Sequence, residues 1–207
     1  MIDVSSGIFN VLIVGVGGQG TILASELLSY VALAAGYDVK KSEVHGMSQR
    51  GGRVESYVRF GKQIYSPLIP KGEVDFLVGF ELAETLRSIE WLSAGGIILT
   101  DTRAILPYTS QVGESPYPFD ALHRIRRRGF DPRVVEGEKL AAQLGEPKAA
   151  NVVLMGALAR LLPVDGDVWR SVIRENMPGN LAPVNLEAFE LGYGSGILTQ
   201  GHDSSTK

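Results

Sequence analysis

The chain has 207 residues, 44% of them hydrophobic, which is enough for one domain with its own core. It has no cysteine, which excludes disulfides, thiolate-held iron–sulfur clusters and cysteine-type zinc sites. It has three histidines, and its formal net charge of −3 gives no reason to expect nucleic acid. The first ten residues lack the features of a signal peptide and no apolar run approaches the ~20 residues that span a bilayer, so we expect a cytoplasmic protein without a membrane contact or a metal site of its own.

The N-terminal part of the chain predicts a β-α-β unit. A continuous apolar run over residues 9–15 suits a buried strand of a parallel sheet. Residues 21–36 have apolar side chains at helical spacing and end at Gly36, a favoured residue after a helix. Residues 37–46 then predict the second strand.

The middle of the chain predicts further strands. Residues 53–61 alternate between apolar and polar side chains, and together with residues 62–70 they suggest a hairpin, which would make the sheet mixed. Residues 74–80 predict a buried strand. A helix over residues 81–92, closed by Gly95 and Gly96, and another strand over residues 96–102 follow.

The C-terminal half predicts mostly helices. Residues 106–118 contain three prolines and predict irregular structure. A short helix, a strand and a helix follow, then a helix over 149–163 that is apolar on almost every side and therefore buried, and two terminal helices. The alternation predicts an α/β, three-layer sandwich with a Rossmann-like, mostly parallel, possibly mixed sheet, forming a single domain over residues 1–194 with a flexible tail over 195–207.

The stretch GVGGQG, residues 15–20, follows the first strand with G-x-G-x-x-G spacing. Glycines let the backbone approach a ligand closely, and the N–H groups at the start of the next helix can hold an anion. The alternative is a tight turn that only allows close helix–strand packing. A nicotinamide or flavin site would also need an acid about 20 residues further on. Glu43 is better placed for this than Asp38, which opens the second strand.

A second glycine-bounded loop, EVHGMSQRGG over residues 43–52, follows the second strand. It should leave the same edge of the sheet as the first loop, where ligands bind in open α/β sheets. Its donors suit a phosphate or a carboxylate, and Arg50 is the natural bidentate partner of either. Alternatively, His45 caps a turn and Arg50 pairs with Glu81 or Glu84.

Three other features have simpler interpretations. Met155 suits core packing, Trp91 and Trp169 lie at apolar helical positions and suit the core or an interface, and Asn151 could cap its helix. The basic stretch HRIRRRG, residues 123–129, is either a solvated helix face or a site for an acidic protein or for phosphate groups.

The two glycine loops together resemble the gamma-type subunit or domain of 2-oxoacid:ferredoxin oxidoreductases. SPLIPKGEVDFLVGFELAETLR, ILTDTRAILP, NVVLMGALARLL and NLEAFELGY are also similar to that family, so the resemblance covers about residues 10–194. Within the family, the length and the C-terminal helices favour the enzymes that act on indolepyruvate and other arylpyruvates. The gamma subunits of the pyruvate and 2-oxoglutarate enzymes share the same loops.

The resemblance implies a reaction that this chain does not run alone. In the family, thiamine diphosphate attacks a 2-oxoacid, carbon dioxide leaves, electrons pass through iron–sulfur clusters to ferredoxin, and the acyl group passes to coenzyme A. Thiamine diphosphate, Mg and the clusters would belong to a larger alpha subunit, which agrees with the lack of cysteine here. This chain would complete the active site at the subunit interface, bind no cofactor tightly by itself, and be inactive alone.

The resemblance also implies which residues serve the site, although it assigns none of them a catalytic step. The first loop would form a backbone turn near coenzyme A or the acyl donor, and the second would offer hydrogen bonds to an anionic group of either. Glu81 would fix Arg50 or His45. Alternatively, both loops only dock the alpha subunit. The candidate binding residues are Gly15, Gly17, Gly18, Gln19, Gly20, His45, Gly46, Ser48, Gln49, Arg50, Gly51, Gly52 and Glu81.

Three rival interpretations remain from the sequence. A stand-alone NAD-dependent oxidoreductase would need an acid on the ribose and a proton-transfer group, and the chain shows no Tyr-x-x-x-Lys pair. An adenylating enzyme commonly uses a cysteine nucleophile or cysteine-held zinc, which this chain lacks. A non-catalytic assembly subunit is the third, and it overlaps with the family's implied role.

Overall fold

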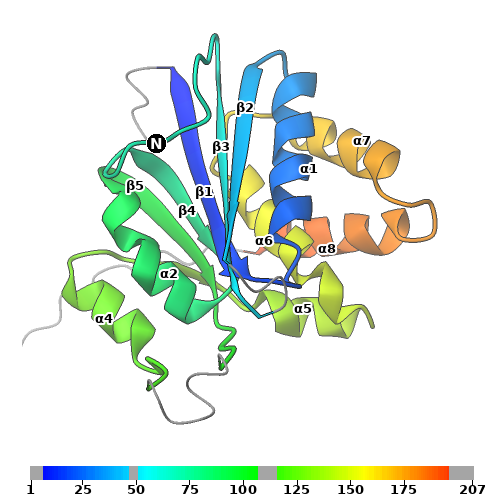
Figure 1. Ribbon diagram of the computed structural model, residues 1–207. Helices are drawn as coiled ribbons and strands as arrows, with labels where there is room; N and C mark the ends of the chain where they lie inside the picture. Colours follow the sequence, from blue (N-terminus) through cyan, green and yellow to red (C-terminus); the bar gives the residue numbers. More distant parts are fainter. Residues whose placement is uncertain (1–6, 47–50, 107–115, 196–207) are drawn as a thin grey trace, which may run out of the picture.

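The computed structural model describes residues 7–46, 51–106 and 116–195, without the side chain of His45. Figure 1 shows helices on both faces of one sheet, so the predicted three-layer α/β sandwich is confirmed. The elements in chain order are β1 (Ile8–Val16), α1 (Thr21–Ala34), β2 (Asp38–His45), β3 (Arg53–Gly61), β4 (Val74–Gly79), α2 (Leu82–Ser88), the 3-10 helix η1 (Ile89–Trp91), β5 (Leu92–Asp101), α4 (Ala121–Arg127), β6 (Arg133–Val135), α5 (Gly137–Gln143), the 3-10 helix η2 (Pro147–Ala149), α6 (Ala150–Ala159), α7 (Gly166–Asn176) and α8 (Ala182–Gly194).

The sheet has the strand order β2-β3-β1-β4-β5-β6 and is mixed. The pairs β1–β4, β4–β5 and β5–β6 are parallel, whereas β3 runs antiparallel to both of its neighbours, β1 and β2. The first two strands therefore point the same way, as a β-α-β unit requires, but they are not adjacent. The expectation of a mostly parallel, possibly mixed sheet is confirmed.

The predicted hairpin joined residues 53–61 to the wrong partner segment. β3 pairs with β2 before it, and the structure has no strand in residues 62–73 after it. That later segment is held by side chains instead: Ile64 N donates to Asp38 Oδ2 at 2.7 Å, and Arg59 donates to the carbonyls of Ser66 and Leu68 at 3.1 and 2.7 Å. Although its sequence alternates, β3 lies between β2 and β1, so side chains on both of its faces are buried.

Alternate residues of β1 belong to two separate cores. Val11 and Ile13 pack with α1, α6, α7 and α8, whereas Leu12 and Val14 pack with Ile125 of α4 and with residues around α2. All ten residues of α6 are buried, as its apolar sequence predicted. Met155 and Trp169 are fully buried in the first core, so that expectation is confirmed.

The helix predicted over residues 81–92 is shorter than expected. It ends as η1 at Trp91, and β5 begins at Leu92, so Gly95 and Gly96 lie inside a strand rather than closing a helix. A Cβ on Gly96 would lie 2.7 Å from the Val74 carbonyl oxygen, where the β4–β5 register shifts. Glycine is therefore needed here for close strand packing.

The two C-terminal helices α6 and α8 cross at glycines. A Cβ on Gly156 would overlap the backbone carbonyl of Phe189, and one on Gly192 would overlap the carbonyl of Val153. The backbones therefore approach more closely than any side chain at these positions would allow. This contact sets the position of α6, which begins beside the glycine loop.

Candidate functional site

The two glycine loops lie side by side at the carboxyl edge of the sheet, as their sequence positions predicted. Gly17 N donates to Gly52 O at 2.8 Å, which joins the loop after β1 to the connection between β2 and β3. Gly18 and Gly20 have φ of 102° and 81°, in the left-handed region that only glycine adopts readily. Gly20 is also the N-cap of α1.

Gln19 fixes the first loop to the neighbouring strand. Its Oε1 accepts from Val16 N at 2.7 Å, and its Nε2 donates to Phe80 O at 2.7 Å. Gly15 is required beside it, because a Cβ there would lie 2.8 Å from Gln19 Oε1. The Gln19 amide was expected among the ligand-binding groups, and the structure shows it engaged in holding the loop that would present the backbone.

A cavity of about 240 Å³ opens beside the first loop, under the carboxyl ends of β4 and β5. It is smaller than the roughly 300–1,000 Å³ of a self-sufficient small-molecule pocket. The walls come from the glycine loop, both strand ends and the starts of α5 and α6. The lining residues are Gly18, Gln19, Phe80, Asp101, Arg103, Glu138, Pro147, Lys148, Ala150, Asn151 and Leu154.

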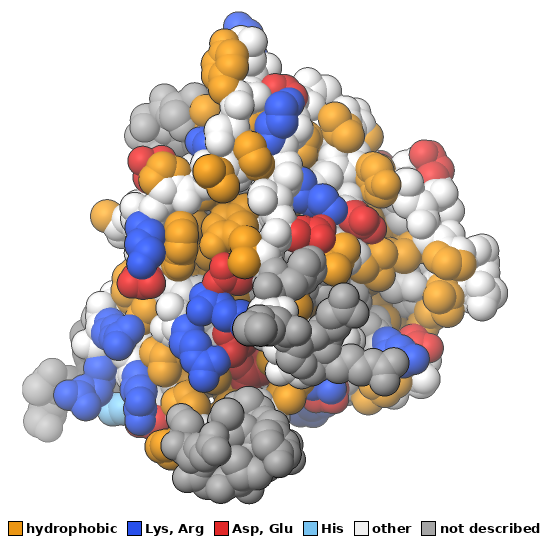
Figure 2. Space-filling model, in the orientation of Figure 1, with side chains coloured by type: hydrophobic (Ala, Val, Ile, Leu, Met, Phe, Trp, Pro, Cys, Tyr) orange, Lys and Arg blue, Asp and Glu red, His pale blue; other side chains and the backbone are white. Residues whose placement is uncertain are grey.

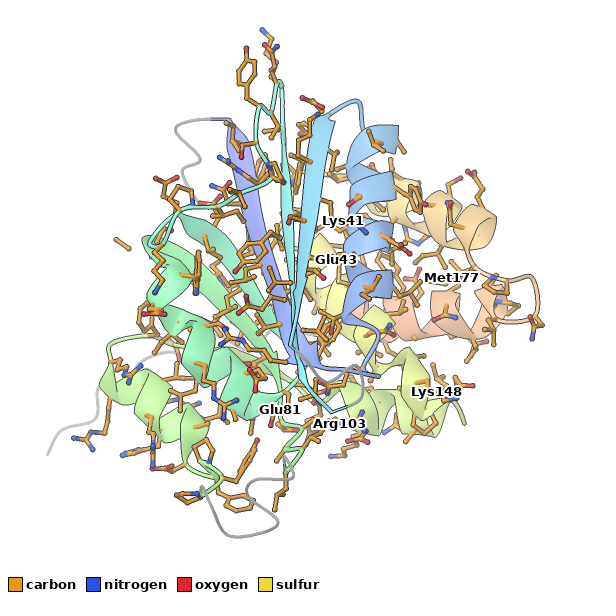
Figure 3. All side chains as sticks on the ribbon, viewed as in Figure 1. Lys41, Glu43, Glu81, Arg103, Lys148 and Met177 are labelled. Carbon is orange, nitrogen blue, oxygen red and sulfur yellow. The ribbon has the colours of Figure 1, made fainter. Side chains whose placement is uncertain are left out.

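Two cations flank this cavity. Arg103 follows β5, and its Nη2 lies 3.5 Å from Glu138 Oε1. Lys148 lies in η2 and is exposed. Figure 3 shows both in the lower part of the molecule, with Arg103 below the sheet and Lys148 to its right. Two cations beside an open glycine turn can attract an anionic group such as a phosphate or a carboxylate.

Asn151 joins the start of α6 to the glycine loop. It was expected to cap its helix, but Ala149 is the N-cap, and Asn151 Nδ2 instead approaches Gly20 O at 3.4 Å. A Cβ on Gly20 would overlap that same amide. The side chain of Asn151 therefore forms part of the surface against which the loop folds.

Asp101 is a buried carboxylate at the end of β5, with only 2% of its surface exposed. Oδ1 accepts from Thr102 N at 2.7 Å and Oδ2 accepts from Glu138 N at 3.2 Å, which ties β5 to the first turn of α5. Burial raises the pKa of Asp101 above its ordinary value, against the opposing effect of these hydrogen bonds. A Cβ on Gly137 would lie 2.9 Å from Asp101 Oδ2, so the carboxylate also requires glycine there.

The raised pKa of Asp101 gives a pH prediction. Between the ordinary and the raised pKa, the folded chain keeps a proton that the unfolded chain has lost, so this group makes stability fall as pH rises. Asp101→Asn removes this pH dependence and places an NH2 donor against one of the two backbone N–H groups. We expect the variant to have an unfolding free energy about 1–3 kcal/mol below that of the wild type. This difference should become smaller as the pH rises above the ordinary pKa of aspartate. Urea unfolding at several pH values tests this, and a deficit that widens with pH would contradict it.

Glu81 is a buried carboxylate at the same edge of the sheet, where it accepts hydrogen bonds from three segments. It is 1% exposed, caps α2 by accepting from Glu84 N at 2.9 Å, and also accepts from Ile105 N at 3.1 Å and from the hydroxyl of Tyr117. Burial and the Glu81 carboxylate raise the pKa of Tyr117. Glu81 was expected to fix His45 or Arg50, whose side chains lie outside the described residues, so this stays a prediction. The partners that the structure describes for its carboxylate are Glu84 N, Ile105 N and the Tyr117 hydroxyl.

The donors of the second loop are only partly described. Ser48, Gln49 and Arg50 lie outside the described residues, and for His45 only the backbone, paired with Val54 in the β2–β3 ladder, is described. Gly46 N donates to Arg53 O at 3.0 Å and Gly51 has φ of 75°, so both ends of the connection are fixed. The ligand contacts assigned to these side chains stay predictions.

The position of β2 argues against a dinucleotide site. In such sites an acid at the end of the second strand reaches the ribose from the strand next to β1. Here β3 separates β2 from β1, so Glu43 lies two strands away from the glycine loop. Its carboxylate is 2.8 Å from Lys41 Nζ and 3.5 Å from Ser25 Oγ, and Figure 3 shows the Lys41–Glu43 pair above the loop, beside α1.

The described residues contain neither a cluster of possible metal ligands nor a helix that could span a membrane. Within residues 7–46, 51–106 and 116–195, no three His, Asp or Glu side chains gather where they could hold a metal ion. In the same part of the chain, no helix combines the length and apolar content needed to cross a bilayer.

Residues 10–195 match the family model of the pyruvate ferredoxin/flavodoxin oxidoreductases. The chain belongs to this family. A sequence relative, indolepyruvate oxidoreductase subunit IorB of Thermococcus kodakarensis, is 42% identical over 89% of this chain and 94% of its own length. The subunit of the same name from Pyrococcus horikoshii is 41% identical with the same coverage.

Solved structures of the pyruvate ferredoxin/flavodoxin oxidoreductase family share the fold. Pyruvate oxidoreductase subunit PORC of Thermotoga maritima superimposes with a TM-score of 0.68 at 22% identity, covering 91% of this chain and 96% of that one. The 2-oxoglutarate:ferredoxin oxidoreductase of Magnetococcus marinus, solved with 2-oxoglutarate, coenzyme A and succinyl-CoA bound, gives 0.69 at 18% identity. There the match covers 91% of this chain but 31% of the other. The fold thus occurs both as a separate chain and as part of a longer one.

Sequence reasoning did not single out Asp101, Arg103, Glu138 and Lys148, which line the cavity. For Asp101 a signal was present, because it is the last residue of a buried strand, where open α/β sheets place their ligands. Lys148 sits in a short polar stretch between helices, and only the folded chain shows that it faces the loop from more than 120 residues away.

Proposed function

We propose that this chain is the non-cluster subunit of a 2-oxoacid:ferredoxin oxidoreductase and that it completes the active site on the surface of a larger subunit. The observation that carries the proposal is the union of two glycine loops beside a small, open, cation-flanked cavity. Such a cavity is one wall of a site, and a second chain can supply the other wall. The chain has no cysteine for clusters, so we propose that it is inactive alone and that the clusters and thiamine diphosphate reside on the partner.

We propose indolepyruvate and related arylpyruvates as the substrates. The support is the 41–42% identity to subunits named for indolepyruvate, compared with 26% and 25% to subunits named for 2-oxoglutarate and pyruvate. Thiamine diphosphate, when bound to the partner, supplies the decarboxylation chemistry. The residues of this chain would hold an anionic group, either the substrate carboxylate or a phosphate of coenzyme A, and would exclude water from the interface.

The assignment is tested by reconstitution. The chain is co-expressed with the cluster-bearing subunit from the same source, and the purified complex is assayed for viologen reduction with indolepyruvate, phenylpyruvate, pyruvate or 2-oxoglutarate in the presence of coenzyme A. We expect thiamine-dependent activity that is highest with an arylpyruvate and disappears when this chain is omitted. Turnover of an NAD-linked substrate by the lone chain would overturn the proposal, and a preference for pyruvate would overturn the substrate assignment alone.

Arg50 is proposed as the main side-chain partner of the anionic group. A charge-assisted hydrogen bond contributes about 1.5–3 kcal/mol, so Arg50→Ala should lower kcat/KM of the complex by roughly tenfold to a hundredfold. The variant chain should remain folded and assembled, as circular dichroism and gel filtration would show. Arg174→Ala, on the exposed face of α7, is the matched control. Normal turnover by the Arg50→Ala complex would remove this residue from the site.

A further inference from the structure

The outer face of α4 is unusually basic for this chain. Four arginines and one aspartate lie in residues 120–128, whereas the whole chain has a net charge of −3. Arg126, Arg127 and Arg128 are exposed, and none of them makes an ion pair with any residue that the structure describes. Figure 2 shows the corresponding cluster of Lys and Arg side chains over the lower left of the molecule, where Figure 1 places α4.

Fold stability explains this basic face only in part. α4 is anchored by Ile125, which is fully buried against the sheet, and cations in its last turn interact favourably with the helix dipole. That effect is about 0.3–1 kcal/mol per charge and falls off within one turn. It does not require three successive arginines, which also repel one another.

A depression and an exposed aromatic ring adjoin the arginines. A hollow of about 550 Å³ between α4 and α2 is lined by four arginines and one carboxylate. The charged residues are Arg53, Arg87, Glu90, Arg124 and Arg128, and Pro116 and Pro118 lie beside them. Arg124 and Arg87 are held by ion pairs with Asp120 and Glu84, so their guanidinium groups are already oriented. Phe119, next to Pro118, has 71% of its surface exposed.

We propose that the surface formed by Phe119, Arg124, Arg126, Arg127 and Arg128, here called the α4 face, docks a carboxylate-rich surface of another protein chain. Arginine and exposed aromatic side chains are the residues enriched in protein interfaces, and arginine forks match carboxylates bidentately. An occupant from this chain itself does not fit the charge, because residues 107–115 and 196–207 contain one acidic residue each. Nucleic acid fits poorly because the basic area is small and the chain as a whole is acidic.

The test measures binding of fluorescein-labelled hexaglutamate to the full chain by anisotropy at several salt concentrations. The variant is the triple Arg126→Gln/Arg127→Gln/Arg128→Gln. The control triple Lys62→Gln/Lys139→Gln/Arg174→Gln removes the same charge from exposed positions elsewhere. We expect binding that weakens with salt, at least tenfold weaker for the α4 triple and less than twofold weaker for the control. Circular dichroism confirms that both variants fold.

Other outcomes would overturn the proposal. No peptide binding would show that the α4 face does not hold carboxylates. An equal loss in the two triples would mean that only net charge matters. Displacement of the peptide by tripolyphosphate at much lower concentration would indicate a small-anion site, and tighter binding of a fifteen-residue oligothymidylate would indicate nucleic acid. The test does not depend on the proposed enzymatic function, since it needs neither the partner subunit nor turnover.

Discussion

Replacing Gly192 by alanine is expected to lower the unfolding free energy by about 3 kcal/mol, the upper part of the range for overpacked cores. In an exposed helix the same change would stabilise the chain by up to about 1 kcal/mol, because alanine is the better helix former. Here the added Cβ would overlap the Val153 carbonyl of α6. A backbone carbonyl in a fully buried helix cannot move aside as a flexible side chain can, so α6 and α8 must separate.

Gly194→Ala is the matched control in the same helix. A Cβ on Gly194 meets no atom within 4 Å, and its φ is not in the left-handed region. We expect Gly194→Ala to change stability by less than about 0.5 kcal/mol, as surface substitutions usually do. Urea unfolding of both variants gives the comparison, and equal stabilities would show that the close approach of the two helices is not needed.

Gly20→Ala is expected to have the second largest effect, on stability and on the site together. The backbone has φ of 81° here, which costs a residue with a Cβ roughly 1–2 kcal/mol. The Cβ would also overlap Asn151 Nδ2, at the edge of the cavity. We expect a loss of about 3 kcal/mol in unfolding free energy, from strain plus overpacking, and a clear decrease in the activity of the reconstituted complex.

A double-mutant cycle separates the two causes. Adding Asn151→Ala to Gly20→Ala should relieve the overlap but not the backbone strain, so part of the stability should return. Gly18→Ala is the control, because Gly18 also has positive φ but a Cβ there meets nothing within 4 Å. If Gly20→Ala costs no more than Gly18→Ala, contact with Asn151 does not constrain the loop.

The sequence predicted the layers well because burial determines them. The apolar runs of β1 and β4 and the all-round apolar α6 allow hardly any location other than the interior. The predicted partner of β3 was wrong because alternation describes one strand and says nothing about which neighbour it pairs with. Only the folded sheet shows that β3 lies between β2 and β1.

The site was predictable to the extent that it follows strand ends. Both glycine loops come directly after strands that point the same way, so their meeting at Gly17 and Gly52 could be anticipated. The hydrogen bonds of Gln19 to the backbone of Val16 and Phe80 could not be anticipated. A loop has no periodicity that shows which way a side chain points. The contact between Asn151 and Gly20 joins residues 131 positions apart and depends on the packing of α6.

The antiparallel insertion of β3 has a consequence for how this scaffold can diversify. Because β2 and β3 form a hairpin, β2 ends and β3 begins at the edge of the sheet that carries the first glycine loop. The ends of the connection over residues 46–52 are closed by the bonds from Gly46 N to Arg53 O and from Gly17 N to Gly52 O. Lengthening or exchanging the residues between these two hydrogen bonds would cost little loop-closure entropy. The rest of the sheet would keep its register, so this connection can change in length and sequence while the strands that carry it stay the same.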